Sequence, residues 1–177
     1  MTTRPTWFDT SIEDSLVAHQ SPEDEQGYFV YQLDALKKHL AQLQQQDVIK
    51  LWFAVKANPL SKIIQTLDSE GFNFDVASSG ELTQVLTQGI SPDRVLNTGP
   101  AKSKQQLEAF VKQGVKTYVV ESLNQLNWLN EVITAQAVAE KPTVLLRVQL
   151  QWPEGEKNPL GGNSLTPFGL SVQEWKK

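Results

Sequence analysis

The segments LWFAVKANP (residues 51–59) and GFNFDVASSGEL (residues 71–82) decide the fold of this chain. Each begins with a short apolar run and ends in turn or capping residues, a pattern that is typical of a strand leading into a helix. Similar runs recur along the chain at intervals of 22 to 26 residues. They predict strands that begin near Ile49, Asn73, Val95, Thr117 and Thr143. This spacing predicts a βα unit repeated about five times.

The helices between these strands have recognisable ends. Asn58-Pro59 predicts an N-cap with proline at the first helical position. Three serines, each followed three residues later by Glu or Gln, predict capping boxes: Ser78, Ser103 and Ser122. Glycines stand where C-terminal caps belong, at Gly71, Gly89 and Gly114. A short β-type run over residues 28–31 and a leucine-striped helix precede the first unit.

Side-chain alternation favours a (β/α) barrel over an open doubly wound sheet. Lys56, Asp75 and Arg147 each end the polar face of a strand whose other face is apolar. A sheet covered by helices on both faces should be apolar on both, whereas inner residues at the C-terminal rim of a barrel form its active site. A complete barrel takes about 250 residues. The expectation is therefore an α/β fold, a partial (β/α)8 TIM barrel over residues 28–177, preceded by an irregular acidic segment over residues 1–27.

Composition excludes several classes of partner. The 177 residues carry 16 Lys and Arg against 20 Asp and Glu, so the net charge of −4 has the wrong sign for binding nucleic acid by counterion release. The longest apolar runs have the length of strands, which predicts no membrane span. With no cysteine and two histidines, we expect no metal site and no disulfide, and a cytoplasmic location.

Lys56 is the residue of greatest chemical interest. Its neighbours Val55 and Ala57 are apolar, and desolvation favours the uncharged amine that attacks carbonyls to form a Schiff base. The alternative is a strand-end lysine whose stem packs while its ammonium reaches solvent. The segment TGPAKS (residues 98–103) lacks the glycine that a phosphate loop needs before its lysine, so it is interpreted as an ordinary βα turn.

Several motifs in order resemble the pyridoxal-phosphate-dependent decarboxylases of fold type III, the family of ornithine, diaminopimelate and carboxynorspermidine decarboxylases. The resemblance covers Tyr28 to Leu170. Besides the two segments quoted first, it rests on YFVYQLDAL (28–36), RVLNTGPAKS (94–103), TYVVESLNQL (117–126), LLRV (145–148) and TPFGL (166–170). It implies an alanine-racemase-like barrel that holds pyridoxal phosphate as an internal aldimine of Lys56, the catalytic residue. The implied reaction removes the α-carboxylate of an amino acid as carbon dioxide.

The resemblance also assigns roles to three cofactor-binding residues besides Lys56. Asp75 would stabilise the positive charge of the lysine or aldimine, Arg147 would lie near the ring and its phenolic oxygen, and Ala54 would leave room beneath the ring. The structural alternative for Asp75 and Arg147 is an ion pair across the barrel. Glu81 is interpreted as a capping residue alone. The implied partners are an amino-acid or carboxylated amine substrate and, for a full-length member, a second copy in a homodimer.

Departures from the family pattern define the alternatives. The rest of the barrel and the C-terminal β domain come later in full-length members, so this chain is expected to be an N-terminal part, inactive by itself. Pro167 before Phe-Gly favours branches acting on larger carboxylated intermediates, including those of siderophore assembly, over the ornithine branch of polyamine biosynthesis. A non-catalytic barrel homologue with a binding or regulatory role is one alternative. An alanine-racemase-like enzyme is another, although residues 58–61 do not match that family.

Overall fold

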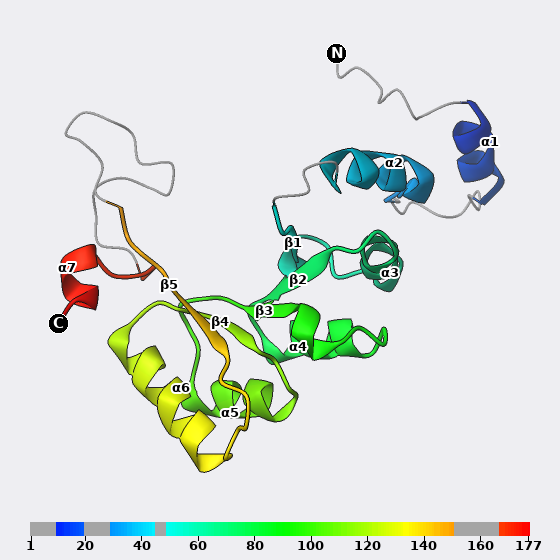
Figure 1. Cartoon of the computed structure of the whole chain (residues 1–177). Coiled ribbons are helices and arrows are strands. Elements are labelled where there is room, and N and C mark those ends of the chain that lie inside the picture. Colours follow the sequence, from blue (N-terminus) through cyan, green and yellow to red (C-terminus); the bar gives the residue numbers. More distant parts are fainter. Residues whose placement is uncertain (1–9, 20–28, 45–48, 151–166) are drawn as a thin grey trace, which may run out of the picture. The chain divides into compact units, whose positions relative to one another are not determined.

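The computed structural model describes residues 10–19, 29–44, 49–150 and 167–177 (Figure 1). The chain divides into two compact units, Met1–Asp47 and Val48–Lys177. The first unit holds α1 (Thr10–His19) and the leucine-striped helix α2 (Leu33–Gln44). Residues 29–32 have no regular secondary structure, so the strand predicted there is wrong over its described part. No helix in the described ranges is long and apolar enough to span a bilayer.

The second unit is built on a five-stranded parallel sheet in the order β1-β2-β3-β4-β5. The strands are β1 (Trp52–Ala54), β2 (Asn73–Val76), β3 (Val95–Asn97), β4 (Thr117–Val120) and β5 (Thr143–Leu146). One helix lies in each crossover: α3 (Ser61–Ser69), α4 (Ser79–Leu86), α5 (Lys104–Lys112) and α6 (Leu123–Ala135). Two 3-10 turns, η1 (Val55–Ala57) and η2 (Pro92–Arg94), and the short α7 (Val172–Trp175) complete it. Strictly sequential order is that of a barrel wall, because an open doubly wound sheet reverses its order at a switch point.

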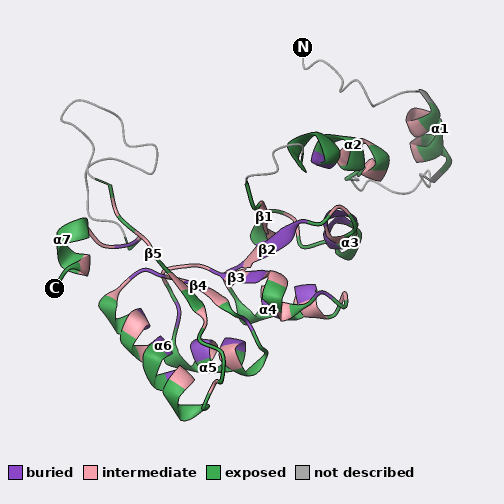
Figure 2. Ribbon diagram, viewed as in Figure 1, coloured by how far each residue is buried: buried purple, intermediate pink, exposed green. Residues whose placement is uncertain are grey.

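The two faces of the sheet differ in burial as the alternation predicted. Side chains on the helix-covered face are fully buried in the central strands: Phe74, Val76, Val95, Asn97, Tyr118 and Val120 (Figure 2). The strand register sets Ala54, Asp75 and Leu96 side by side on the other face. The edge strand β5 is less covered: Leu146, which pairs with Val120 on the helix-covered face, is 46% exposed. The buried face supplies the core, and the opposite face is left to carry polar side chains.

Serine caps begin three of the crossover helices, as predicted. Each hydroxyl accepts a hydrogen bond from the backbone N–H three residues on, in the pairs Ser78–Glu81, Ser103–Gln106 and Ser122–Gln125. The reciprocal bond differs from the predicted capping box. Glu81 and Gln125 accept instead from the N–H of the residue before the cap, Ala77 and Glu121, at 2.8 and 2.9 Å. Predicted C-terminal caps at Gly71, Gly89 and Gly114 all have positive φ.

The N-cap predicted at Asn58 is wrong, since α3 is capped at Leu60 and begins at Ser61. Asn58 has an extended conformation, and its side-chain Oδ1 accepts from the Leu60 N–H at 3.3 Å. This Asx-type contact stabilises a turn instead of a helix start. Strand β1 likewise begins at Trp52, three residues after the predicted start.

Glutamine side chains connect the βα loops after β1, β2 and β3 to the next unit. Three amide groups donate to carbonyls of the preceding loop: Gln84 to Pro59 at 2.8 Å, Gln106 to Ala77 at 2.9 Å and Gln125 to Pro100 at 2.7 Å. These bonds satisfy loop carbonyls that no strand pairs with. They hold the loops at the carboxyl edge of the sheet, where the polar side chains gather.

Candidate functional site

Four polar side chains follow one another along the carboxyl edge of the sheet. Asp75 lies on β2, Thr98 directly follows β3, Glu121 directly follows β4, and Arg147 directly follows β5. All four belong to the same face by alternation, and the parallel register brings their strands side by side. The rim expected from a barrel therefore exists, and Asp75 and Arg147 are on it.

Lys56 lies at the same edge but in a different setting from the one predicted. The strand ends at Ala54, and Lys56 is the middle residue of the 3-10 turn η1, which the Asn58 N–H closes by bonding to Val55 O at 3.1 Å. Its side chain is exposed. The prediction that Lys56 ends the strand and is desolvated there is thus wrong, because the strand ends two residues earlier, at Ala54. Its exposure agrees with the structural alternative, in which the ammonium reaches solvent. An exposed amine is open to a ligand.

Asp75 is half-buried and close enough to Lys56 to interact electrostatically. Its Oδ1 accepts the Thr98 hydroxyl at 2.5 Å. Burial raises the pKa of the Asp75 carboxyl, and Glu81 adds to that effect, while the Thr98 hydrogen bond, Lys56 and Lys102 oppose it. Ala54 is the direct neighbour of Asp75 on β1. The structure therefore brings Lys56, Ala54 and Asp75 together.

Arg147 pairs with Glu121, where the structural alternative expected Asp75. Its Nη1 lies 3.2 and 3.3 Å from the two Glu121 oxygens, and the Glu121 side chain is only 1% exposed. The guanidinium also lies over the Phe168 ring, 4.6 Å from its centroid. The two charges come from neighbouring strands, so the ion pair links the ends of β4 and β5. Asp75 is not part of this pair; it accepts a hydrogen bond from Thr98 and interacts with Lys56.

Lys102 is the buried cation of the site. Its side chain belongs to the loop interpreted as an ordinary βα turn, yet the residue is 4% exposed. The ammonium donates to Gly99 O and to Val119 O, the latter at 2.8 Å. Burial lowers the pKa of Lys102 to about 8, and Arg147 adds to the decrease, while Glu121 and Asp75 oppose it.

Sequence reasoning missed two residues of the rim, Thr98 and Glu121, and also Lys102 in the loop beside them. Glu121 and Arg147 occupy the same position, the first residue after a β-type run, so the TYVVE pattern held a usable signal. Thr98 follows β3 in the same way. The burial of Lys102 had no comparable signal, since its partners are backbone carbonyls.

Stability should depend on pH through Lys102. Because its folded pKa of about 8 lies below the ordinary 10.5, the unfolded chain binds more protons than the folded chain between these values. The free energy of unfolding should therefore rise with pH from about 8 to 10. Urea unfolding across this range should show the rise in the wild type and not in Lys102→Met. A parallel slope in both proteins would contradict the assignment.

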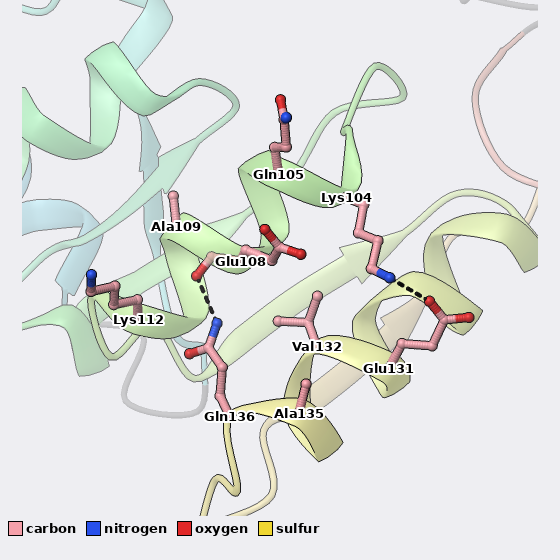
Figure 3. Close-up of a pocket in the computed structure, with 9 residues that line it drawn as sticks. All are labelled: Lys104, Gln105, Glu108, Ala109, Lys112, Glu131, Val132, Ala135 and Gln136. Carbon is pink, nitrogen blue, oxygen red and sulfur yellow. Dashed lines mark hydrogen bonds and ion pairs between the residues drawn. The ribbon is translucent and has the colours of Figure 1, made fainter.

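The outer helix layer also carries a groove, between α5 and α6 (Figure 3). Two polar contacts join the helices across it: Lys104 Nζ lies 2.7 Å from Glu131 Oε2, and the Gln136 side chain donates to Glu108 O at 3.1 Å. None of the rim residues lines it. The groove is a surface feature of the helix layer, separate from the polar side chains at the carboxyl edge of the sheet.

Comparison with known proteins agrees with this geometry. The protein-family model described as "Pyridoxal-dependent decarboxylase, pyridoxal binding domain" matches residues 31–177. The chain belongs to this family. The match covers the whole sheet and every rim residue of this pyridoxal-binding domain. The fold class predicted from strand spacing and the family predicted from the motifs are both confirmed.

Curated relatives of this pyridoxal-binding domain include decarboxylases with different substrates in their names and one protein named as an inhibitor. The diaminopimelate decarboxylase of Zymomonas mobilis is 30% identical over 69% of this chain and 29% of the relative. The 2-[(L-alanin-3-ylcarbamoyl)methyl]-2-hydroxybutanedioate decarboxylase of Staphylococcus aureus is 29% identical over 83% of this chain and 36% of the relative. Antizyme inhibitor 2 of Xenopus laevis is 31% identical over 59% of this chain and 23% of the relative. The chain thus spans about a quarter to a third of these relatives.

A solved structure shows the same fold. The arginine decarboxylase of Paramecium bursaria Chlorella virus superposes with a TM-score of 0.74 at 21% identity, over 93% of this chain and 42% of the other. At that identity the likeness concerns the fold. The five βα units of this pyridoxal-binding domain therefore have the arrangement found in a decarboxylase barrel.

Proposed function

We propose that this chain forms part of the cofactor site of a pyridoxal-phosphate-dependent amino-acid decarboxylase, with Lys56 as the residue that binds the cofactor. One observation carries the proposal: an exposed amine, a half-buried carboxylate and a guanidinium lie along one carboxyl edge of a barrel sheet that belongs to this family, with the amine and the carboxylate close enough to interact. Active sites of such barrels lie at this edge.

The chemistry of these side chains fits pyridoxal phosphate. The aldehyde of the cofactor needs a primary amine, which Lys56 offers in an exposed turn. An anionic ring oxygen suits the guanidinium of Arg147, which is 34% exposed. The small side chain of Ala54 lies beside Asp75 on the same face. When bound, the cofactor supplies an electron sink for the carbanion left when carbon dioxide departs.

Side chains of the protein stabilise the charge on Lys56 and fix the orientation of the charged groups around it. Asp75 stabilises a positive charge on the Lys56 nitrogen, and the Thr98 hydroxyl fixes the orientation of that carboxylate. Glu121 holds the Arg147 guanidinium through two contacts, so its direction is set before any ligand arrives. A charge pattern arranged in advance costs little reorganisation during the reaction.

The substrate we propose is an amino acid or a carboxylated amine. The names of two relatives contain diaminopimelate and a carbamoyl-substituted hydroxybutanedioate, both carrying more than one carboxylate. Ornithine decarboxylases are also among the relatives, so the names alone do not choose between these substrates. Pro167 before Phe-Gly supports a larger carboxylated substrate, such as an intermediate of siderophore assembly, over ornithine. A homodimer of the full-length protein and a cytoplasmic location stay predictions.

A regulatory role without catalysis is the second candidate. It is supported by the similarity to antizyme inhibitor 2, whose name describes an inhibitor. A protein that keeps the barrel for shape alone has no need of an amine, a carboxylate and a guanidinium at one rim. Binding of the cofactor separates the two candidates.

Titration with pyridoxal phosphate, followed by the visible absorption of the Schiff base, tests the proposal. Replacing Asp75 with Asn removes the carboxylate near Lys56 and should weaken binding by about 10-fold or more, because charge-assisted contacts contribute about 1.5–3 kcal/mol. Asp93→Asn is the matched control: this carboxylate is exposed and pairs with Lys116 on the surface, so binding should not change. Equal affinities of the two variants would exclude Asp75 from the site.

A further inference from the structure

We infer that Lys102 is a positioning residue of the rim: its ammonium fastens the loop of residues 98–101 to the end of β4 and thereby holds Thr98 against Asp75. The inference concerns how the protein's own charges are arranged before any ligand binds. Only its consequence for cofactor binding rests on the proposed function.

The Lys102 side chain links the β3 loop to β4 at the level where the main-chain pairing of the two strands stops. The last paired residues of β3 and β4 are Asn97 and Tyr118, and the β3 chain then turns away into its loop. Beyond this level, Val119 O accepts from the Lys102 ammonium at 2.8 Å. The same ammonium donates to Gly99 O in its own loop. One side chain thus ties the loop to the neighbouring strand.

The anchored loop is packed closely against the preceding unit. Gly99 has φ +102°, and a Cβ at this position would lie 3.4 Å from the Ala77 Cβ. The side-chain amide of Gln125 donates to Pro100 O at 2.7 Å, while its oxygen accepts the Glu121 N–H at 2.9 Å. The loop therefore has a fixed place between the end of β2 and the end of β4.

The two ends of this loop are linked to the two groups of charges on the rim, Asp75 with Lys56 on one side and Glu121 with Arg147 on the other. On one side Thr98 donates to Asp75, the carboxylate that interacts with Lys56. On the other side Pro100, through Gln125, holds the backbone of Glu121, the partner of Arg147. Release of the loop would therefore loosen the side-chain bond from Thr98 to Asp75, although the Thr98 N–H also bonds to Val76 O at 3.0 Å.

The charge of Lys102 acts at the same place. It opposes the rise that burial causes in the pKa of Asp75, and it is attracted in turn by Asp75 and Glu121. The other charged groups acting on these residues are Lys56, Glu81 and Arg147. Loss of the Lys102 charge should therefore shift Asp75 toward its protonated form, both directly and through a weakened Thr98 bond.

Lys104 provides a matched comparison two residues away. It is exposed and pairs with Glu131 on the helix layer at 2.7 Å. If any positive charge in this segment were enough to hold the loop, replacing Lys104 would change Asp75 as much as replacing Lys102. If burial and the bonds to backbone carbonyls are required, only the replacement of Lys102 should change Asp75.

The test is an NMR titration of the Asp75 carboxyl in the full chain without cofactor. In Lys102→Met the pKa of Asp75 should be higher than in the wild type, and in Lys104→Met it should be unchanged. In the Thr98→Val background the further shift caused by Lys102→Met should be smaller, because Lys102 acts partly through the Thr98 hydroxyl. An Asp75 pKa that Lys102→Met leaves in place, or equal shifts from both lysine variants, would overturn the inference.

A second measurement needs no variant and so does not depend on the folding of Lys102→Met. In the wild type, the Asp75 signal should show a second inflection near pH 8, where Lys102 loses its proton. Its absence would also overturn the inference.

Cofactor binding is measured separately, so the two failures are distinguishable. Lys102→Met should weaken pyridoxal phosphate binding by about 10-fold through the misplaced carboxylate, while Lys104→Met should not. A wild type that responds in the Asp75 titration but binds no cofactor would contradict the proposed function alone. A wild type that binds cofactor without the titration response would contradict only the role of Lys102.

Discussion

Arg147→Met should lower the free energy of unfolding by about 3 kcal/mol, because it leaves the buried Glu121 carboxylate without its ion-pair partner. Glu121 is 1% exposed, and its two oxygens lie 3.2 and 3.3 Å from the Arg147 Nη1. Methionine keeps most of the aliphatic stem but offers neither a donor to Glu121 nor the guanidinium that lies over the Phe168 ring. Urea unfolding at neutral pH measures the loss.

A double-mutant cycle with Glu121→Gln separates the ion pair from packing. Each single variant leaves one charge unpaired, so Glu121→Gln with Arg147→Met should cost less than the sum of the single changes. Lys104→Met is the control, since it breaks the exposed pair with Glu131 and should cost no more than about 1 kcal/mol. If Arg147→Met costs as little as this control, the pair behaves like a surface ion pair and our account of the rim is wrong.

Gly169→Ala should be at least as damaging, by about 3 kcal/mol or more. Gly169 is buried with φ +81°, and a Cβ there would lie 2.4 Å from the carbonyl oxygen of Arg147. That carbonyl already accepts from the Leu170 N–H at 3.1 Å and from the Trp175 indole at 2.9 Å. The variant should therefore detach residues 168–175 from the end of β5. Faster amide hydrogen exchange at Gln149 and Leu170 would report the detachment.

Gly89→Ala isolates the clash from the backbone strain. Gly89 has the same φ of +81°, but a Cβ there would have no heavy atom within 4 Å. It should cost only the strain of a left-handed alanine, about 1–2 kcal/mol. Equal losses for the two variants would show that the segment after residue 166 does not pack on Arg147.

Most of the fold could be predicted because strand and helix signals alternate regularly. Four of the five strands begin at the expected residues, and the serine caps hold as predicted. The strand β1 was predicted too long. Its apolar run continues through Val55, but the backbone turns at that residue into a 3-10 turn, and apolar pattern alone does not distinguish the two conformations.

Half of the rim could be predicted for a similar reason. Asp75 and Arg147 stand out because each is a charge beside an apolar strand face. The partners of these residues depend on strand register: Glu121 meets Arg147 only because β4 and β5 are adjacent. Lys102 depends on still finer detail, the place where β3 and β4 cease to pair and leave Val119 O to a side chain.

The most direct test of the cofactor site is chemical capture. The full chain is incubated with pyridoxal phosphate, reduced with borohydride and digested, and the labelled lysine is identified by peptide mass. We expect the label on Lys56, its loss in Lys56→Ala, and its retention in Lys62→Ala, which removes another exposed lysine nearby. Label spread over many surface lysines, or label unchanged in Lys56→Ala, would contradict the assignment of Lys56 as the cofactor-binding residue.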